Sequence, residues 1–233
     1  MPSSPTNNPL QQATAAAFAT DGALAQGQAH YRPRTAQLQM ASAVAESIEQ
    51  TGTLVVEAGT GTGKTFAYLV PALLSGQRVL VSTATKTLQE QLYGRDLPTV
   101  LQALGIHSRT ALLKGRANYL CLYRMQQART QALPSNLLTS LVSVERWAQH
   151  TETGDLAEVA QLAEDSPLRP WVTSSRENCL GSQCPSYDSC HLAKARTQAM
   201  QAELVVINHH LLFADMALKE EGFGQLLPQT DIV

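Results

Sequence analysis

The stretch TLVVEAGTGTGKT, residues 53–65, decides the fold of this 233-residue chain. Its apolar start at residues 54–56 predicts a buried parallel strand, and the apolar series at residues 66–74 predicts a helix packed against a sheet. A glycine-rich turn between a strand and a helix N-terminus is typical of a phosphate-binding loop, because glycines let backbone N–H groups curl around phosphate oxygens. The sequence therefore predicts a site for a nucleoside triphosphate.

Two side chains at the end of this stretch carry the expected phosphate chemistry. Lys64 is expected to reach the β- and γ-phosphates, and the Thr65 hydroxyl is expected to hold Mg²⁺. The first position of the pattern G-x-x-x-x-G-K-[ST] is Ala58, so the strict motif is missed by one methyl group. The other candidate nucleotide-binding residues form the turn itself: Gly59, Thr60, Gly61, Thr62 and Gly63.

The composition indicates a globular chain with one sizeable core, since 44% of residues are hydrophobic and 15% are charged. Residues 78–129 hold eight Lys and Arg against two acids, whereas residues 130–170 hold six acids against two Arg. A basic half beside an acidic half suggests a polyanion contact, and ordinary solvated faces explain it equally well. No apolar run is long enough for a membrane helix and no secretory signal is present, so we expect a cytoplasmic protein.

The remaining chain predicts alternating strands and helices. Residues 1–27, rich in Pro, Ser, Asn, Gln and Ala, predict a mobile arm. Met40, Val44 and Ile48 share one face of a predicted helix. Gln37 is a candidate reader of adenine, because its amide both donates and accepts hydrogen bonds. Further strands are predicted at residues 78–82, 109–113 and 204–208 and from residue 231; helices are predicted at 83–92, 193–202 and 209–215, with a helix-rich acidic stretch over 130–175 that includes Trp147 in its core.

Four cysteines are the candidate metal ligands. Three of them lie within twelve residues of one another in NCLGSQCPSYDSCH, and the fourth lies 58 residues upstream (179 − 121). Four thiolates fit either a [4Fe–4S] cluster or a structural zinc ion, and the three-plus-one spacing favours the cluster over the paired pattern of zinc sites. The four residues are Cys121, Cys179, Cys184 and Cys190; helical or surface roles suit His191, His209 and His210 better than ligation.

Basic residues near the second and third predicted strands are candidate contacts for a nucleic-acid backbone. Hydroxyls, a lysine and free N–H groups at the start of the helix near residue 83 suit a phosphate, although capping of the helix by Thr83 or Thr85 explains the hydroxyls too. A solvated surface role is an equal alternative for each candidate, namely Lys86, Arg95, Lys114 and Arg116.

Taken together, several stretches closely resemble the iron–sulphur DNA helicases of the XPD/DinG family, especially its bacterial YoaA/DinG branch. The resemblance covers residues 31–233. It depends on R-x-x-Q-x-x-M from Arg34 to Met40, EAGTGTGKT, STATKTLQEQL, LKGRANYLC, the three-cysteine loop and ELVVINHHLLFAD. Each motif is ordinary alone; their order, with the cysteines inserted between the second and third motifs, is specific.

The resemblance implies an α/β fold: a RecA-like P-loop motor domain, with a parallel sheet flanked by helices and an inserted, mainly helical iron–sulphur domain. The expected boundaries are 1–27 for the arm, 28–113 for the first part of the motor, 114–200 for the insert and 201–233 for the return. It further implies an ATP-dependent 5′→3′ helicase acting on single-stranded or forked DNA in repair or replication stress, with replication or repair proteins as partners. Arg34 and Gln37 would bind the nucleotide, and the four cysteines would hold a [4Fe–4S] cluster.

The chain departs from this family at its end. The family continues from an apolar strand into D-E-A-H, whose acids hold Mg²⁺ and position the attacking water, and no such stretch occurs here. We therefore expect an N-terminal fragment that binds ATP but hydrolyses it negligibly alone. Two alternatives remain: a P-loop kinase or ATPase with a structural zinc site, and a non-enzymatic DNA-binding module that carries the cluster.

Overall fold

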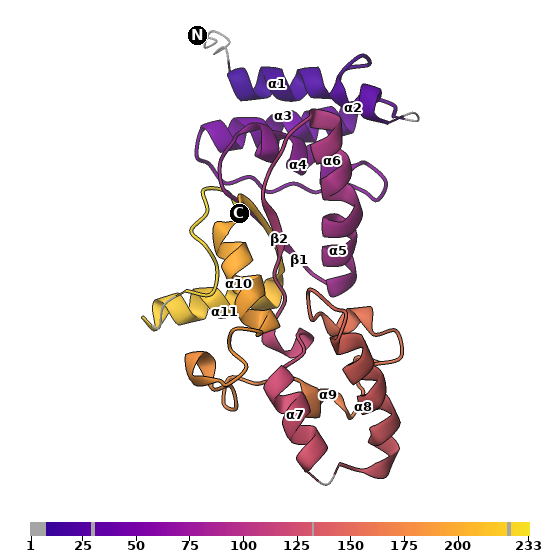
Figure 1. Cartoon of the computed structure of the whole chain (residues 1–233). Coiled ribbons are helices and arrows are strands. Elements are labelled where there is room, and N and C mark those ends of the chain that lie inside the picture. Colours follow the sequence, from indigo (N-terminus) through magenta and orange to yellow (C-terminus); the bar gives the residue numbers. More distant parts are fainter. Residues whose placement is uncertain (1–7, 29–30, 132, 223–224) are drawn as a thin grey trace, which may run out of the picture. The chain divides into compact units, whose positions relative to one another are not determined.

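The structure is a computed structural model that describes residues 8–28, 31–131, 133–222 and 225–233. The chain forms two compact units, whose elements are labelled in Figure 1. The described residues within 1–110, 202–209 and 229–233 build the first unit, and those within 111–201 and 210–228 build the second. The sequence assigns residues 210–228 to the returning motor domain, whereas their contacts lie mainly within the second unit.

Three short strands form the sheet: β1 (Val79–Thr83), β2 (Thr110–Leu112) and β3 (Leu204–Asn208), in the order β1-β3-β2. β1 and β3 run parallel, with Val79 opposite Leu204. All five residues of β3 are buried, as expected for the central strand of a parallel sheet covered on both faces. These strands confirm the predictions at residues 78–82, 109–113 and 204–208.

The strand predicted at residues 54–56 does not form, and this prediction is wrong. Leu54, Val55 and Val56 are 41%, 93% and 39% exposed in irregular backbone. An apolar run becomes a strand only where a neighbouring strand supplies hydrogen bonds. Here a cavity of about 940 Å³, lined by Leu54 and Val56 as well as by β1, lies beside the segment. At this edge of β1 the Leu80 N–H donates instead to the Ile232 carbonyl at 2.8 Å. The strand predicted from residue 231 is therefore present only as an isolated parallel bridge between Val79 and Ile232.

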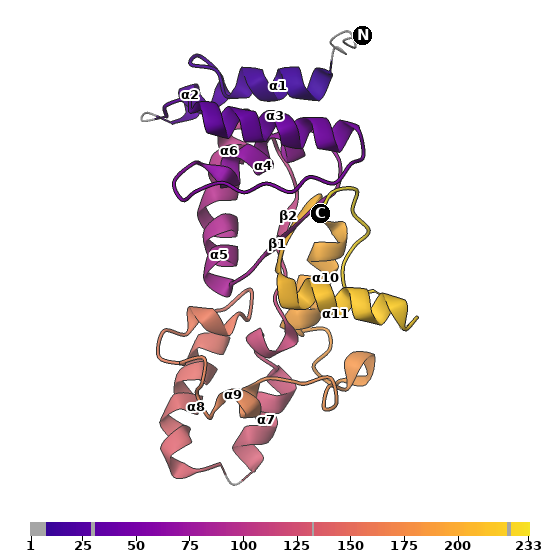
Figure 2. The same ribbon diagram turned by 180° about the vertical axis from the view of Figure 1, so that it is seen from behind.

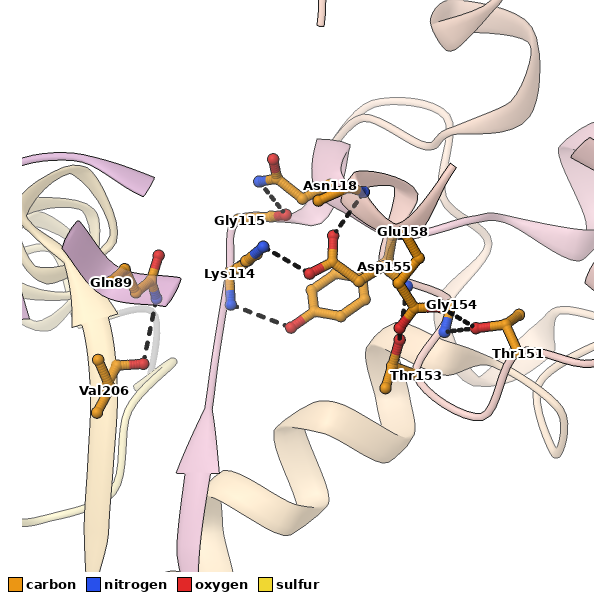
Figure 3. A network of polar contacts seen from close by, with 12 residues as sticks. Gln89, Lys114, Gly115, Asn118, Thr151, Thr153, Gly154, Asp155, Glu158 and Val206 are labelled. Atoms are coloured by element: carbon orange, nitrogen blue, oxygen red, sulfur yellow. Dashed lines mark hydrogen bonds and ion pairs between the residues drawn. The ribbon is translucent and has the colours of Figure 1, made fainter. Parts of the chain in front are cut away.

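The helices of the first unit cover the sheet. α3 (Thr35–Glu49), α4 (Lys64–Leu74) and α5 (Lys86–Gln91) confirm predicted helices, whereas the sequence analysis did not predict α6 (Leu97–Leu104). A π-helical turn at Leu92–Asp96 joins α5 to α6. Met40, Val44 and Ile48 of α3 line the apolar cavity, while the residues buried from α3 are Gln37, Ala41 and Ala45. α5 packs on β1 and β3, and its fully buried Gln89 donates from Nε2 to the Val206 carbonyl at 3.2 Å (Figure 3).

Two helices occupy most of the stretch predicted as a mobile arm, so that prediction is wrong for them. α1 (Pro9–Ala17) packs against α3 and α4, and α2 (Ala23–Gly27) packs against α6; Figures 1 and 2 both show α1 alongside α3. The Leu10 N–H donates to Glu49 Oε1 at 2.8 Å, and Leu24 is fully buried. A few buried apolar side chains are enough to hold these helices in place. The average composition of residues 1–27, on which the prediction of a mobile arm rested, does not reveal such single contacts. Residues 1–7 of the predicted arm lie outside the described residues.

The second unit is helical apart from part of β2. Its helices are α7 (Leu122–Thr130), α8 (Ser135–Ala148), α9 (Arg169–Val172), α10 (His191–Gln201) and, from His210 onward, α11 (His209–Glu220). Leu120, Leu141, Val144 and Leu168 belong to one buried cluster, against which Trp147 packs, as predicted. Figure 2 shows α7, α8 and α9 together in this unit. Among the described helices, none has the length and apolarity needed to cross a membrane.

Candidate nucleotide loop and four-cysteine pocket

The predicted phosphate loop leads directly into α4. Gly61 and Gly63 have φ of +76° and +82°, left-handed conformations that favour glycine, and Gly63 caps the helix. The Lys64 ammonium donates to the carbonyls of Ala58 and Gly59, both at 2.7 Å. The side chain therefore folds back over the loop, next to the N–H groups at the start of α4. This arrangement places a positive charge and free helix N–H groups together, as an anion site requires.

Two residues of the N-terminal motif contact the same loop. Gln37 is 6% exposed and donates from Nε2 to the Gly63 carbonyl at 3.0 Å. A Cβ at residue 63 would lie 2.1 Å from that nitrogen, so this contact requires glycine. The Arg34 guanidinium donates to the Gly61 carbonyl. The structure thus brings both predicted residues to the loop backbone.

The predicted Mg²⁺ ligand lies on the first turn of α4. The Thr65 hydroxyl hydrogen-bonds the phenol of Tyr68. Burial raises the pKa of Tyr68, and this hydrogen bond partly offsets the rise. Tyr68 is therefore a neutral phenol beside Thr65.

The carboxyl ends of β1 and β3 bring polar groups side by side. Ser82 Oγ and His209 Nδ1 are 2.7 Å apart. Thr85 caps α5, since its hydroxyl accepts from the Leu88 N–H at 3.2 Å, which confirms the capping alternative. Lys86 is half-buried at the start of that helix. Such groups at the ends of parallel strands are placed to meet a phosphate.

The four basic candidates fall into different environments. The prediction that Lys114 contacts DNA is wrong, because its side chain is only 2% exposed and its ammonium lies 2.5 Å from Asp155 Oδ2. Arg116 lines the cysteine pocket. Arg95 is exposed but pairs with Asp96 at 2.8 Å. A backbone contact to DNA therefore remains a prediction for Lys86, Arg95 and Arg116.

The four cysteines line one cavity of about 560 Å³ in the second unit, although they come from separate segments. Cys121 precedes α7, Cys179 and Cys184 flank a short 3₁₀ turn, and Cys190 precedes α10. All four are free thiols. Their backbone positions are fixed by hydrogen bonds; for example, the Cys121 N–H donates to the Val172 carbonyl at 2.8 Å, and the Cys190 N–H to the Tyr187 carbonyl at 2.9 Å.

The electrostatics of this cavity differ from one thiol to another. Burial raises the pKa of the Cys121 thiol, and the three other thiols raise it further. At Cys179 burial also acts to raise the pKa, but the Gly181 N–H and the Arg116 guanidinium outweigh it and hold the pKa below its ordinary value. Burial and then the charge of Arg116 lower the pKa of Arg196, whose attractive neighbours are Cys179, Cys190 and Tyr119. Two guanidiniums therefore face the thiols.

Within the described part of the chain, no three His, Cys, Asp or Glu side chains are grouped closely enough to hold one metal ion. The histidines beside the motifs have other roles: His209 pairs with Ser82, and His191 is 7% exposed and packs on Gly154. The structural feature that the four cysteines have in common is the cavity that they line.

Sequence reasoning missed Arg196 and the loop that contains Gly154. Arg196 lies on α10, six residues after Cys190. A basic residue so close to the three-cysteine loop is the sequence signal that could have identified Arg196 as part of the site. T-E-T-G-D at residues 151–155 is a turn pattern, but nothing local indicates what the turn contacts.

Comparison with known proteins gives the family. The model of the DEAD/DEAH box helicase family matches residues 36–156. ATP-dependent DNA helicase YoaA of Haemophilus influenzae is 51% identical over 218 residues, covering 93% of this chain and 34% of that protein. ATP-dependent helicase DinG of Mycobacterium tuberculosis is 40% identical over 208 residues, covering 78% and 31%. The 3′-5′ exonuclease DinG of Bacillus subtilis is 30% identical over 215 residues, covering 86% and 22%.

The chain thus spans about a third or less of the length of these curated relatives. The family model covers more than half of the chain, and it includes the loop at Lys64 and the segment around Cys121. The chain belongs to the DEAD/DEAH box helicase family.

Proposed function

We propose that this chain supplies the first RecA-like motor domain of a cytoplasmic, ATP-dependent 5′→3′ DNA helicase of the iron–sulphur type, which acts in DNA repair or under replication stress. The observation that carries the proposal is the convergence of Cys121, Cys179, Cys184 and Cys190 on one cavity in a chain of the helicase family. Relatives at 51% and 40% identity are named ATP-dependent helicases, which supports the activity.

ATP with Mg²⁺ is the proposed ligand of the loop before α4. The Lys64 ammonium now bonds two carbonyls of its own loop, and the β- and γ-phosphates would take over these bonds. Thr65 would hold Mg²⁺, and Gln37 would read the adenine, while Arg34 would help to bind the nucleotide by fixing the loop. Hydrolysis further needs acids that position water and arginines that stabilise charge. We therefore expect the chain alone to bind ATP and to hydrolyse it negligibly.

A [4Fe–4S] cluster is the proposed occupant of the cysteine cavity. A tetrahedral zinc site needs all four sulfurs about 2.3 Å from one ion. Three cysteines close together with a fourth far upstream in the sequence favour a cluster over the paired cysteines typical of zinc sites, and all four line one cavity. The guanidiniums of Arg116 and Arg196 suit its negative charge. Bound there, the cluster would supply a rigid, redox-active cross-link between these four segments.

Single-stranded or forked DNA is the proposed substrate, with replication or repair proteins as partners of the whole protein. The polar ends of β1 and β3, with Ser82, His209 and Lys86, are the proposed contacts to the phosphate backbone. Opening and closing of the ATP-bound motor would move the enzyme along the strand.

The test uses the intact protein on duplexes with a 5′ or a 3′ single-stranded tail. The proposal predicts ATP-dependent unwinding of the 5′-tailed duplex, stimulation of ATP hydrolysis by single-stranded DNA, and loss of both in Lys64→Ala. ATP turnover that ignores DNA would favour a zinc-bearing P-loop ATPase instead. DNA binding that survives Lys64→Ala but fails in Cys179→Ser, without unwinding, would favour a non-enzymatic DNA-binding module.

A further inference from the structure

We propose that the 151–158 loop, between α8 and the segment before α9, is a positioning device for two of the four thiols, Cys121 and Cys190. The inference rests on the proposed function, in which the four cysteines bind one metal centre. Its basis is that a single rigid loop contacts both the residue before Cys121 and the residue after Cys190.

The 151–158 loop holds itself together. The Gly154 N–H donates to Thr151 Oγ1 at 2.9 Å, and the Asp155 N–H donates to Thr153 Oγ1 at 3.0 Å. The Glu158 carboxylate accepts from the Thr151 hydroxyl at 2.9 Å, from Trp147 Nε1 at 3.1 Å and from the Thr153 hydroxyl. Figure 3 shows Thr151, Thr153, Gly154, Asp155 and Glu158 gathered in this network. The loop therefore has a defined shape that it can impose on what it touches.

On one side the loop contacts the segment that leads to Cys121. The Gly154 carbonyl accepts from the Leu120 N–H at 2.8 Å, and Tyr119 and Asp155 form an antiparallel bridge. The buried Lys114 reaches the same Asp155 at 2.5 Å (Figure 3). The Lys114 N–H in turn donates to the Tyr119 hydroxyl at 3.0 Å, which closes the segment on itself. These contacts come from both ends of the segment between β2 and Cys121.

On its other side the loop receives the residue after Cys190. Gly154 has φ of +65°, and a Cβ there would lie 2.2 Å from His191 Cγ and 2.5 Å from Cδ2. The imidazole therefore lies directly on bare glycine backbone. His191 is 7% exposed. The first residue of α10 is thus fitted into the loop.

Gly154 takes part in the contacts on both sides of the loop. Its carbonyl holds Leu120, and its Cα surface receives His191. Cys121 directly follows Leu120 in the sequence, and Cys190 directly precedes His191. By holding Leu120 and His191, the loop therefore sets the distance between the backbones of the two cysteines. A metal centre binds tightly only when its ligands are held in place by the groups behind them. The loop provides this support without contributing a ligand.

The test compares Gly154→Ala with Gly222→Ala in the full chain, reconstituted anaerobically with iron and sulphide. Gly222 also has a positive φ, +74°, but a Cβ there would meet no atom within 4 Å. The control therefore carries the same backbone cost without the clash. We expect Gly154→Ala to release its iron to a chelator about ten- to a hundred-fold faster than the wild type, as for the loss of a group that supports metal ligands. Gly222→Ala should match the wild type.

Nucleotide binding at Lys64 and far-UV circular dichroism are measured on every variant to show that the chain is folded. If Gly154→Ala does not fold, Glu158→Gln is the deciding variant, because it weakens the hydrogen bonds within the loop with little change of volume and keeps the Lys114–Asp155 pair. Accelerated release is again expected. Wild-type release rates in the folded variant would overturn the positioning role and leave the cluster standing. If the wild type takes up zinc rather than iron, the cluster proposal fails, and the same comparison of zinc release decides on the loop. A wild type that binds neither metal overturns both.

Discussion

The ammonium of Lys114 lies 2.5 Å from the carboxylate of Asp155, and the two side chains are 2% and 15% exposed. This pair joins residues that are 41 positions apart in the sequence (155 − 114). Removing one partner of a buried pair leaves an uncompensated charge, whereas replacing both removes the charges together.

Lys114→Met should therefore destabilise the chain by about 3–5 kcal/mol, because the Asp155 carboxylate is left without its partner. The double variant Lys114→Met/Asp155→Leu should recover much of that loss. Urea unfolding followed by circular dichroism measures both changes. A double variant no more stable than Lys114→Met would show that packing, rather than charge pairing, dominates at this position.

Lys64→Ala should weaken ATP binding by about ten- to a hundred-fold, since a charged hydrogen-bond donor contributes about 1.5–3 kcal/mol. Titration with a fluorescent ATP analogue measures the dissociation constant. Lys194→Ala, at an exposed lysine of α10, is the control and should bind as the wild type does. Equal affinity in the wild type and Lys64→Ala would exclude this loop as the nucleotide site.

Arg196→Gln should shift the reduction potential of the proposed cluster to a more negative value. A guanidinium beside the thiols stabilises the reduced centre, which carries one more negative charge, and this help is lost with the side chain. Anaerobic titration followed by visible absorption measures the potential. Lys194→Gln removes a charge from the exposed face of the same helix and should leave the potential nearly unchanged. Equal shifts in the two variants would assign the effect to net charge alone.

Acid should weaken the first unit through Glu203. The Ser108 hydroxyl donates to its carboxylate at 2.9 Å and the Arg109 N–H at 3.1 Å, and both bonds lower the pKa of Glu203 below its ordinary 4.5. A lowered pKa adds stability above pH 4.5, and this contribution is lost as the pH falls through the folded-state pKa. Glu203→Gln should therefore lose less stability than the wild type between pH 5 and 3 on thermal melting, whereas Glu220→Gln, at the exposed glutamate that ends α11, should behave as the wild type.

Local patterns predicted much of this molecule. The turn glycines, Lys64 and the apolar series after it fix α4 through neighbours in the sequence, and β3 is recognisable because a buried central strand is apolar throughout. Residues 54–56 carry the same apolar signal but lack a strand beside them, which no local pattern reveals.

The cysteine site shows the same division. Its four ligand candidates could be named from residue type and spacing, and the structure brings them to one cavity. Lys114 was misassigned because its partner, Asp155, is distant in sequence. Gly154 and Arg196 were missed for a related reason: what matters about each is its contact with a segment that folding brings near.

The most direct test of the central claim is elemental analysis of the anaerobically purified chain for iron, acid-labile sulphide and zinc, together with its visible spectrum. The account predicts about four irons and four sulphides per chain and broad absorption at about 400 nm. Iron, sulphide and absorption should all be lost when Cys121, Cys179, Cys184 or Cys190 is changed to Ser. One zinc per chain with no iron would contradict it, and would leave an ATP-binding domain of the helicase family with a structural zinc site.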